Sequence, residues 1–197
     1  MAGIAGFRDF VRGMTLLAEQ GADEARWLDE GKALLAGLVQ RDDWLPEAFA
    51  EPGPTYRQYL LHCDPLERFC VVSFVWGPGQ STPVHNHTVW GLVGMLRGEE
   101  TSTTYRFGAP GQPMLAGEKE MLRPGEVVAV SPNLEDIHRV ENAVADAASI
   151  SIHVYGGNIG AVARHVFDPA TGAPKRFISG YTAAVVPNLW DHSKEAA

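Results

Sequence analysis

Cysteine is scarce in this chain of 197 residues, which contains only Cys63 and Cys70. Their spacing matches neither the C-x-x-C pair of redox and zinc motifs nor the dense disulfide framework of a small secreted scaffold. The first residues also lack the charged and then apolar layout of a secretion signal, and no apolar run is long enough to span a bilayer. We therefore expect a cytoplasmic protein whose two thiols are free and act as small buried hydrophobes.

Positive charge is also in short supply. The chain has 16 lysines and arginines against 24 aspartates and glutamates, which gives a formal net charge of −8 at pH 7. Nucleic acids and anionic membranes attract proteins through basic patches, and this balance disfavours both kinds of partner. We therefore expect no nucleic-acid partner and no membrane partner.

Internal repeats are absent as well, so the length favours a single domain over residues 1–197 with one buried core. Apolar residues recur at helical intervals over 7–20 and again over 23–38, and a third, short helical piece is expected over 43–49. The Pro-Gly-Pro run at 52–54 ends this part of the chain. We therefore expect a helical cap over residues 1–50.

After residue 54 the segments become short, rich in β-branched and aromatic residues, and separated by glycine and proline. This pattern is typical of an all-β barrel or sandwich. The strands that it predicts span residues 56–63, 69–76, 81–87, 90–97, 100–107, 118–122, 127–131, 136–141, 148–155 and 164–168. We therefore expect a mostly β fold over residues 55–180, with a short polar tail over residues 190–197.

Two histidines, His85 and His87, stand two residues apart within the predicted strand 81–87. Alternate residues of a strand point to the same face, so both imidazoles can converge on one metal ion without backbone strain. Gly79 and Gly98 provide turns at either end of this stretch. A third imidazole, His138, lies downstream, and we expect the barrel to bring it to the other two.

These residues resemble the motifs of the cupin superfamily. Gly79, His85, His87 and Gly98 match its first motif, which runs Gly, five residues, His-x-His and a later Gly. The second motif ends in His-x-x-x-Asn, which His138 and Asn142 match. The resemblance implies a jelly-roll-like β-barrel that carries the metal site, preceded by N-terminal α-helices.

The first cupin motif also contains a glutamate, and Gly91 stands in its place. Three histidines without a carboxylate are similar to the ligand set of the thiol dioxygenases, the cysteine dioxygenase family. Ser151, His153 and Tyr155 match the Ser-x-His-x-Tyr signature of that family, and alternation places them on one strand face as a hydrogen-bonded row. The resemblance implies one Fe(II) per chain on the three histidines, with the row as catalytic residues. On motif position alone it makes Asn142 and Asn86 supporting partners of the ligands.

Two further departures concern the substrate pocket. Mammalian-type members carry a cysteine near position 91, which cross-links to the tyrosine, and that cross-link cannot form here. They also use Tyr-x-Arg to hold the substrate carboxylate, whereas Tyr56-Arg57-Gln58 places a glutamine at the arginine position. This resembles the bacterial 3-mercaptopropionate dioxygenases, in which an arginine nine residues after the tyrosine takes over, and Arg164 stands at that distance from Tyr155. A one-residue slip of the strand would turn Arg57 inward in place of Gln58 and would restore a cysteine-type pocket. A cysteine dioxygenase proper, which converts L-cysteine to cysteine sulfinate, therefore stays an alternative.

The resemblance implies that a small thiol carboxylate and O2 react to give a sulfinic acid. A metal-bound thiol loses its proton, and three neutral imidazoles favour such an anionic ligand. Arg164 would bind the substrate carboxylate, with Gln58 as a neutral donor, and Tyr155 would donate a hydrogen bond in the pocket. Together Gln58 and Arg164 favour 3-mercaptopropionate over L-cysteine.

Two alternatives stay open at this point. A cupin isomerase, or a dioxygenase of carbon substrates, would hold Mn, Ni or Zn on the same histidines and would leave the Ser-x-His-x-Tyr row unexplained. A non-catalytic cupin would bind a metal or ligand without O2 uptake. The histidines themselves do not choose, because three imidazoles bind Zn and Ni at least as well as Fe(II).

Overall fold

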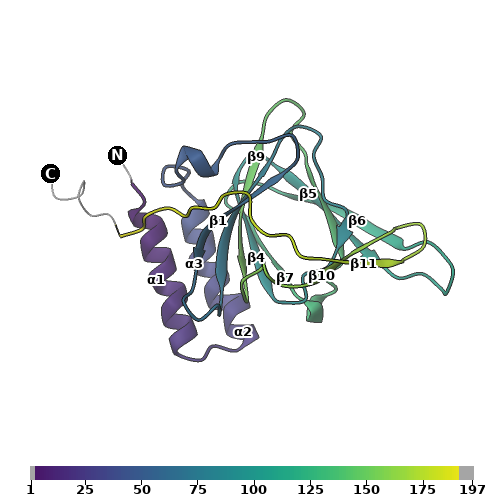
Figure 1. Cartoon of the computed structure of the whole chain (residues 1–197), viewed down its shortest axis with the longest axis horizontal. Coiled ribbons are helices and arrows are strands. Elements are labelled where there is room, and N and C mark those ends of the chain that lie inside the picture. Colours follow the sequence, from purple (N-terminus) through teal and green to yellow (C-terminus); the bar gives the residue numbers. More distant parts are fainter. Residues whose placement is uncertain (1–2, 191–197) are drawn as a thin grey trace.

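The computed structural model describes residues 3–190, and the predicted tail of residues 190–197 lies outside this range except for Trp190. The described part begins with helices and continues as two antiparallel sheets (Figure 1). The mostly β fold class is therefore confirmed: two antiparallel sheets form a barrel-like body preceded by N-terminal α-helices. None of the described helices is long and apolar enough to cross a membrane.

The helical part consists of two packed segments. The first is α1 (Ala5–Glu19), and the second runs through α2 (Glu24–Arg26), a π-helical turn (Trp27–Gly31) and α3 (Lys32–Val39). The Asp23 side chain caps α2 by accepting a hydrogen bond from the Arg26 amide. Gly13 lets the two segments approach closely, because a Cβ there would lie 3.0 Å from the side chain of Leu34. The predicted helix over 43–49 is only a short 3-10 turn (Glu47–Phe49), which begins after Pro46.

The helices cover the outer face of a five-stranded sheet (Figure 1). Its strand order is β1-β2-β9-β4-β7, with β1 (Arg57–Cys63), β2 (Cys70–Trp76), β9 (Ser149–Tyr155), β4 (Gly91–Arg97) and β7 (Val127–Val130). Leu35 and Val39 of α3 lie so close to β4 that a Cβ at Gly94 would be 2.9–3.1 Å from them. This packing buries the main hydrophobic core between helices and sheet.

The second sheet has six strands in the order β11-β10-β3-β8-β5-β6. They are β11 (Pro174–Phe177), β10 (Arg164–Phe167), β3 (Val84–His85), β8 (His138–Asn142), β5 (Glu100–Arg106) and β6 (Leu115–Leu122), with a short 3-10 turn (Pro132–Leu134) before β8. The predicted strand 81–87 shrinks to two residues, because Pro83 has no amide hydrogen to donate and Thr88 adopts a positive φ of 61°. Strand β11 was not predicted, since its residues are largely polar and exposed.

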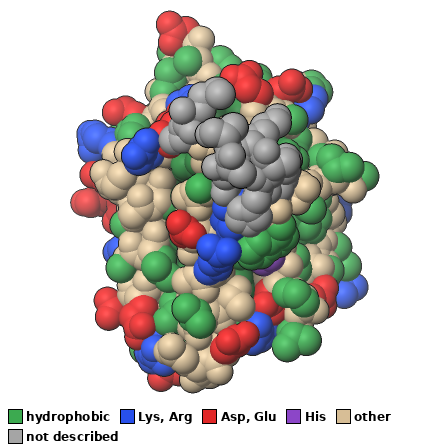
Figure 2. All heavy atoms as spheres, turned by 90° about the vertical axis from the view of Figure 1, so that its left-hand side faces the viewer, with side chains coloured by type: hydrophobic (Ala, Val, Ile, Leu, Met, Phe, Trp, Pro, Cys, Tyr) green, Lys and Arg blue, Asp and Glu red, His purple; other side chains and the backbone are tan. Residues whose placement is uncertain are grey.

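Both cysteines are free, as predicted. Burial raises the pKa of Cys70 to about 11, so this thiol stays protonated at neutral pH. On the side of the molecule that carries the helices, acidic and basic side chains are interspersed with apolar ones, without a basic patch among the described residues in view (Figure 2).

Candidate metal centre

Three buried imidazoles meet inside the barrel. His85 of β3 and His138 of β8 are direct partners across the six-stranded sheet, and His87 lies just beyond the end of β3. The ring centroids are 4.8–4.9 Å apart in all three pairs. One ligand atom from each ring lies within 4.8 Å of the others, so this group could hold a metal ion.

Each of these rings has one nitrogen engaged. Nδ1 of His85 lies 3.1 Å from the Pro83 carbonyl, and Nδ1 of His138 lies 2.9 Å from Oγ of Ser102. Nδ1 of His87 lies 3.3 Å from Oδ2 of Asp136, which also accepts the His87 backbone N–H at 2.8 Å. Partners at Nδ1 leave Nε2 of each ring as the metal-binding atom and fix the ring orientation, as in protein metal sites. The donor set therefore fits a transition metal.

Electrostatics keeps the three rings neutral. Burial lowers the pKa of His85 to about 3, and the nearby His87 adds to this effect. Burial also lowers the pKa values of His87 and His138. A neutral imidazole has a free lone pair, which is the form that binds metals. The site is therefore ready for a metal ion at neutral pH without first losing protons.

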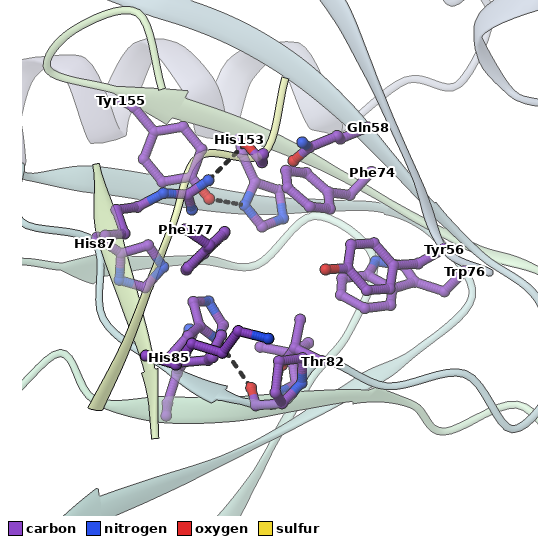
Figure 3. Close-up of a pocket in the computed structure, with 17 residues that line it drawn as sticks. Tyr56, Gln58, Phe74, Trp76, Thr82, His85, His87, His153, Tyr155 and Phe177 are labelled. Atoms are coloured by element: carbon purple, nitrogen blue, oxygen red, sulfur yellow. Dashed lines mark hydrogen bonds between the residues drawn. The ribbon is translucent and has the colours of Figure 1, made fainter. Parts of the chain in front are cut away.

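The imidazoles open into a cavity of about 230 Å³, which suits a small molecule. Figure 3 shows His85 and His87 on one side and the stacked rings of Tyr56 and Trp76, 4.8 Å apart, on the other. The rest of the wall combines aliphatic, aromatic, polar and cationic side chains. It includes Gln58, Phe74, Thr82, Pro83, Val140, His153, Tyr155, Arg164, Val166, Lys175, Phe177 and Ser179.

The predicted row on β9 is present. Oγ of Ser151 lies 2.8 Å from Nε2 of His153. Nδ1 of His153 lies 2.8 Å from the Tyr155 hydroxyl, as Figure 3 shows for His153 and Tyr155. The Tyr155 ring stacks on the imidazole of His87 at 5.7 Å. Burial raises the pKa of Tyr155 and lowers that of His153, so both are neutral. The row therefore brings a protonated phenol to the edge of the metal centre.

Arg164 is a buried cation in the cavity wall. Its side chain on β10 is 3% exposed, donates from Nη2 to Ser179 Oγ at 2.7 Å and lies 4.8 Å from the ring centre of Phe177. Its Nε has no hydrogen-bond partner, and no carboxylate within residues 3–190 forms an ion pair with it. Burial lowers its pKa. A buried guanidinium without an acidic partner is a receptor for an anionic ligand.

A comparison with known protein families identifies the family of this chain. The family model described as Cysteine dioxygenase type I matches residues 66–168, which is more than half of the chain. The chain belongs to this family. Cysteine dioxygenase type 1 of Bos taurus is 25% identical over 113 residues, 56% of this chain and 55% of the relative. The chain thus spans about half the length of this curated relative of the cysteine dioxygenase type I family.

Two solved structures match this chain at low identity. A double-stranded β-helix protein from Klebsiella pneumoniae is 16% identical with a TM-score of 0.42, covering 68% of this chain and 87% of that chain. A cupin superfamily protein from Desulfitobacterium hafniense is 16% identical with a TM-score of 0.43, covering 60% of this chain and 94% of that chain.

The structure explains why this cysteine dioxygenase type I family member has glycine where the cupin motif has glutamate. Gly91 pairs with Tyr155 across β4 and β9. A Cβ at this position would lie 2.8 Å from the Tyr155 ring and 2.9 Å from Val130. No side chain fits there while the tyrosine keeps its place beside His87. A fourth protein ligand from this position is therefore excluded by packing.

The strand register places Gln58, and not Arg57, in the cavity. Gln58 pairs with Phe74 across β1 and β2, lines the cavity and donates from Nε2 to the Gly180 carbonyl at 2.6 Å. Arg57 is the preceding residue, so it points to the opposite face, where Nη1 lies 2.9 Å from the Tyr59 hydroxyl. The register slip that would bring Arg57 inward does not occur.

Asn142 and Asn86, predicted to support the ligands, bond backbone groups elsewhere. The Asn142 amide donates to the carbonyls of Trp76 and Ala147, and Oδ1 of Asn86 accepts the backbone N–H of His165. Both therefore hold strand ends together. The side chains that do contact the imidazoles, Asp136 and Ser102, were not predicted. For Asp136, the one hint in the sequence was its position two residues before the predicted ligand His138.

Replacing Asp136 with asparagine should weaken metal binding about 10–100-fold, because the carboxylate that orients His87 and raises its basicity is lost. Competition with a chelating dye measures the change. The matched control is Glu135→Gln, since the adjacent Glu135 is exposed and pairs with Arg106. Equal affinity in the Asp136 variant and the control would contradict this role.

Proposed function

We propose that this chain is a non-haem iron thiol dioxygenase, which converts a small thiol carboxylate and O2 to the corresponding sulfinic acid. One observation carries the proposal: three neutral imidazoles face one small cavity together with a buried guanidinium that has no acidic partner within residues 3–190. Such a cavity offers a metal to a thiol and a cation to a carboxylate of the same small molecule. Membership of the cysteine dioxygenase type I family supports the same reaction class.

His85, His87 and His138 would hold the iron. When bound, Fe(II) lowers the pKa of a coordinated thiol and supplies the redox chemistry with O2. Since the three histidines are neutral, the site would retain the full charge of the ion and would favour an anionic ligand. A thiolate would meet this need and would leave the substrate carboxylate for Arg164.

The residues of the chain orient the substrate and exclude water. Arg164 binds the carboxylate, and its contacts with Ser179 and Phe177 fix the guanidinium. The stacked rings of Tyr56 and Trp76 close the far wall. Tyr155 presents a neutral hydroxyl beside His87, where it donates a hydrogen bond to the reacting groups.

We further propose that 3-mercaptopropionate is a better substrate than L-cysteine. The described lining of the cavity includes Arg164 and Lys175 but no aspartate or glutamate. The ammonium group of cysteine would therefore lose its hydration without gaining an anionic partner. Gln58 adds a neutral donor, and 3-mercaptopropionate has no amine to accommodate.

Oxygen uptake by the iron-loaded protein tests both proposals when the two thiols are run side by side. We expect uptake with each thiol and a specificity constant about tenfold or more higher for 3-mercaptopropionate, which corresponds to roughly 1.4 kcal/mol. Arg57→Ala should leave this preference unchanged, because Arg57 lies outside the cavity. A preference for cysteine would overturn the substrate assignment, and no uptake with either thiol would overturn the reaction.

A further inference from the structure

Glu100, the first residue of β5, is a buried carboxyl group that the proposed reaction does not use. It is 2% exposed, and Oε1 accepts a hydrogen bond from Oγ of Ser149 at 3.1 Å. Oε2 forms no hydrogen bond within the described residues. Ser149 lies two residues before Ser151 on the same face of β9, so this hydrogen bond places Glu100 at the outer end of the row. The Ser151 hydroxyl also lowers the pKa of this carboxyl, against the larger effect of burial.

A second cavity of about 270 Å³ lies on this side of the metal centre. It is lined by Glu100 together with His138, which also faces the substrate cavity. The other titratable groups on its wall are Glu120, Glu135 and Asp136, and none of them is a cation that could pair with Glu100. Burial raises the pKa of Glu100 to about 8, against the opposing effect of the Ser151 and Ser149 hydroxyls. The carboxyl therefore changes protonation near physiological pH.

The hydrogen bonds along the row of Ser151, His153 and Tyr155 can be donated in either direction. A neutral imidazole carries one proton, so His153 donates from one nitrogen and accepts at the other. Ser151 also accepts a weak hydrogen bond from the Trp76 indole at 3.4 Å, which is compatible with either direction. Whether Glu100 donates to Ser151 or accepts from it therefore sets the direction of donation along the whole row.

A protonated Glu100 would donate to Ser151 from Oε2, the oxygen that forms no hydrogen bond within the described residues. Ser151 then donates to Nε2 of His153, and Nδ1–H of His153 donates to the Tyr155 oxygen. The Tyr155 proton is left free to point into the substrate cavity.

An ionised Glu100 accepts the Ser151 proton instead. Ser151 then accepts from Nε2–H of His153, and Nδ1 of His153 accepts the Tyr155 proton. Only the lone pairs of the Tyr155 oxygen then face the substrate cavity, so the hydroxyl no longer donates to a bound ligand.

We propose that Glu100 is a positioning residue whose protonation sets the tautomer of His153 and thereby decides whether the Tyr155 hydroxyl donates into the substrate cavity. The tautomer switch needs only the hydrogen bonds of the row and one between Glu100 and Ser151, so it does not depend on which reaction the site carries out. Its effect on turnover rests on the proposed function, in which a donating Tyr155 is the active form. Activity should then decline as the pH rises through about 8, while Glu100 ionises.

Nitrogen-15 NMR of the zinc-loaded protein tests the switch without any turnover, because zinc is diamagnetic. The His153 signals are assigned by their loss in His153→Gln. We expect the proton of His153 to move from Nδ1 to Nε2 with a midpoint near pH 8. Glu100→Gln should hold one tautomer throughout, from about pH 6 to about pH 10, and should flatten the alkaline decline in activity. Glu99→Gln, in which the neighbouring exposed carboxyl changes, should behave as wild type.

One tautomer of wild-type His153 across the whole pH range would overturn the proposal, whatever substrate the enzyme uses. An unchanged transition in Glu100→Gln would overturn it as well. If that variant does not fold, Ser151→Ala interrupts the same connection and should also remove the transition. A tautomer switch without oxygen uptake would retain the role of Glu100 and reject the proposed function.

Discussion

His87→Ala should reduce bound iron to background and should lower turnover on the order of a thousandfold, since metal stabilisation of a reaction contributes several kcal/mol. The barrel should still fold. His87 lies beyond the end of β3, and the loop around it is held by its own backbone N–H, which donates to Asp136. Elemental analysis of the purified protein, together with circular dichroism, measures the two parts of this prediction.

His165→Ala is the matched control. His165 lies on β10, one residue beyond Arg164, and is not among the residues that line the cavity. This variant should keep its iron and its activity. Stoichiometric iron in His87→Ala, at the affinity of the control, would reject the three-histidine site.

Arg164→Met should raise the Michaelis constant about 10- to 150-fold, because a hydrogen bond to a charged group contributes roughly 1.5–3 kcal/mol. The turnover number should change much less, since the metal ligands are untouched. The free energy of unfolding should fall much less than the loss of substrate affinity. No acid among residues 3–190 loses a partner when this buried cation is removed, and methionine keeps most of the apolar length. Steady-state kinetics and thermal unfolding measure the two effects.

Arg176→Met provides the comparison for this charge change. Arg176 lies on β11, the strand next to Arg164, and is exposed. The variant should bind substrate as the wild type does. If the Michaelis constant rises equally in both variants, the cavity does not bind the carboxylate through Arg164.

The sequence predicted those site residues whose side chains share a face because they alternate along one strand. His85 and His87, and likewise Ser151, His153 and Tyr155, are spaced so that an extended backbone brings them to one side. The pairing of His85 with His138 needs a sheet, and it was expected from the barrel fold and from the resemblance of His138 and Asn142 to the second cupin motif.

The parts that sequence could not predict depend on contacts between distant segments. Asp136 and Ser102 reach the imidazoles from separate strands or loops, and nothing local distinguishes them from other polar residues. Strand β11 is formed by pairing with β10 despite its polar residues, and it brings Phe177 to Arg164. The choice between Arg57 and Gln58 was likewise settled by the register with β2, which one strand alone does not specify.

The helices have a part in the site that their sequence alone does not reveal. Helix α3 packs on β4, and β4 in turn carries Gly91, against which Tyr155 lies. On the same, helix-facing side of this sheet, the rings of Trp27 and Trp90 stack 4.9 Å apart. The helical layer thus fixes the sheet that holds the row on β9.

The most direct measurement is the mass of the product formed from 3-mercaptopropionate by the iron-loaded protein under O2 labelled with oxygen-18. We predict a sulfinic acid that carries two labelled oxygen atoms, formed in step with O2 consumption and absent with His87→Ala. A product with one labelled atom or none, or a disulfide as the main product, would contradict the assignment of this chain as a thiol dioxygenase.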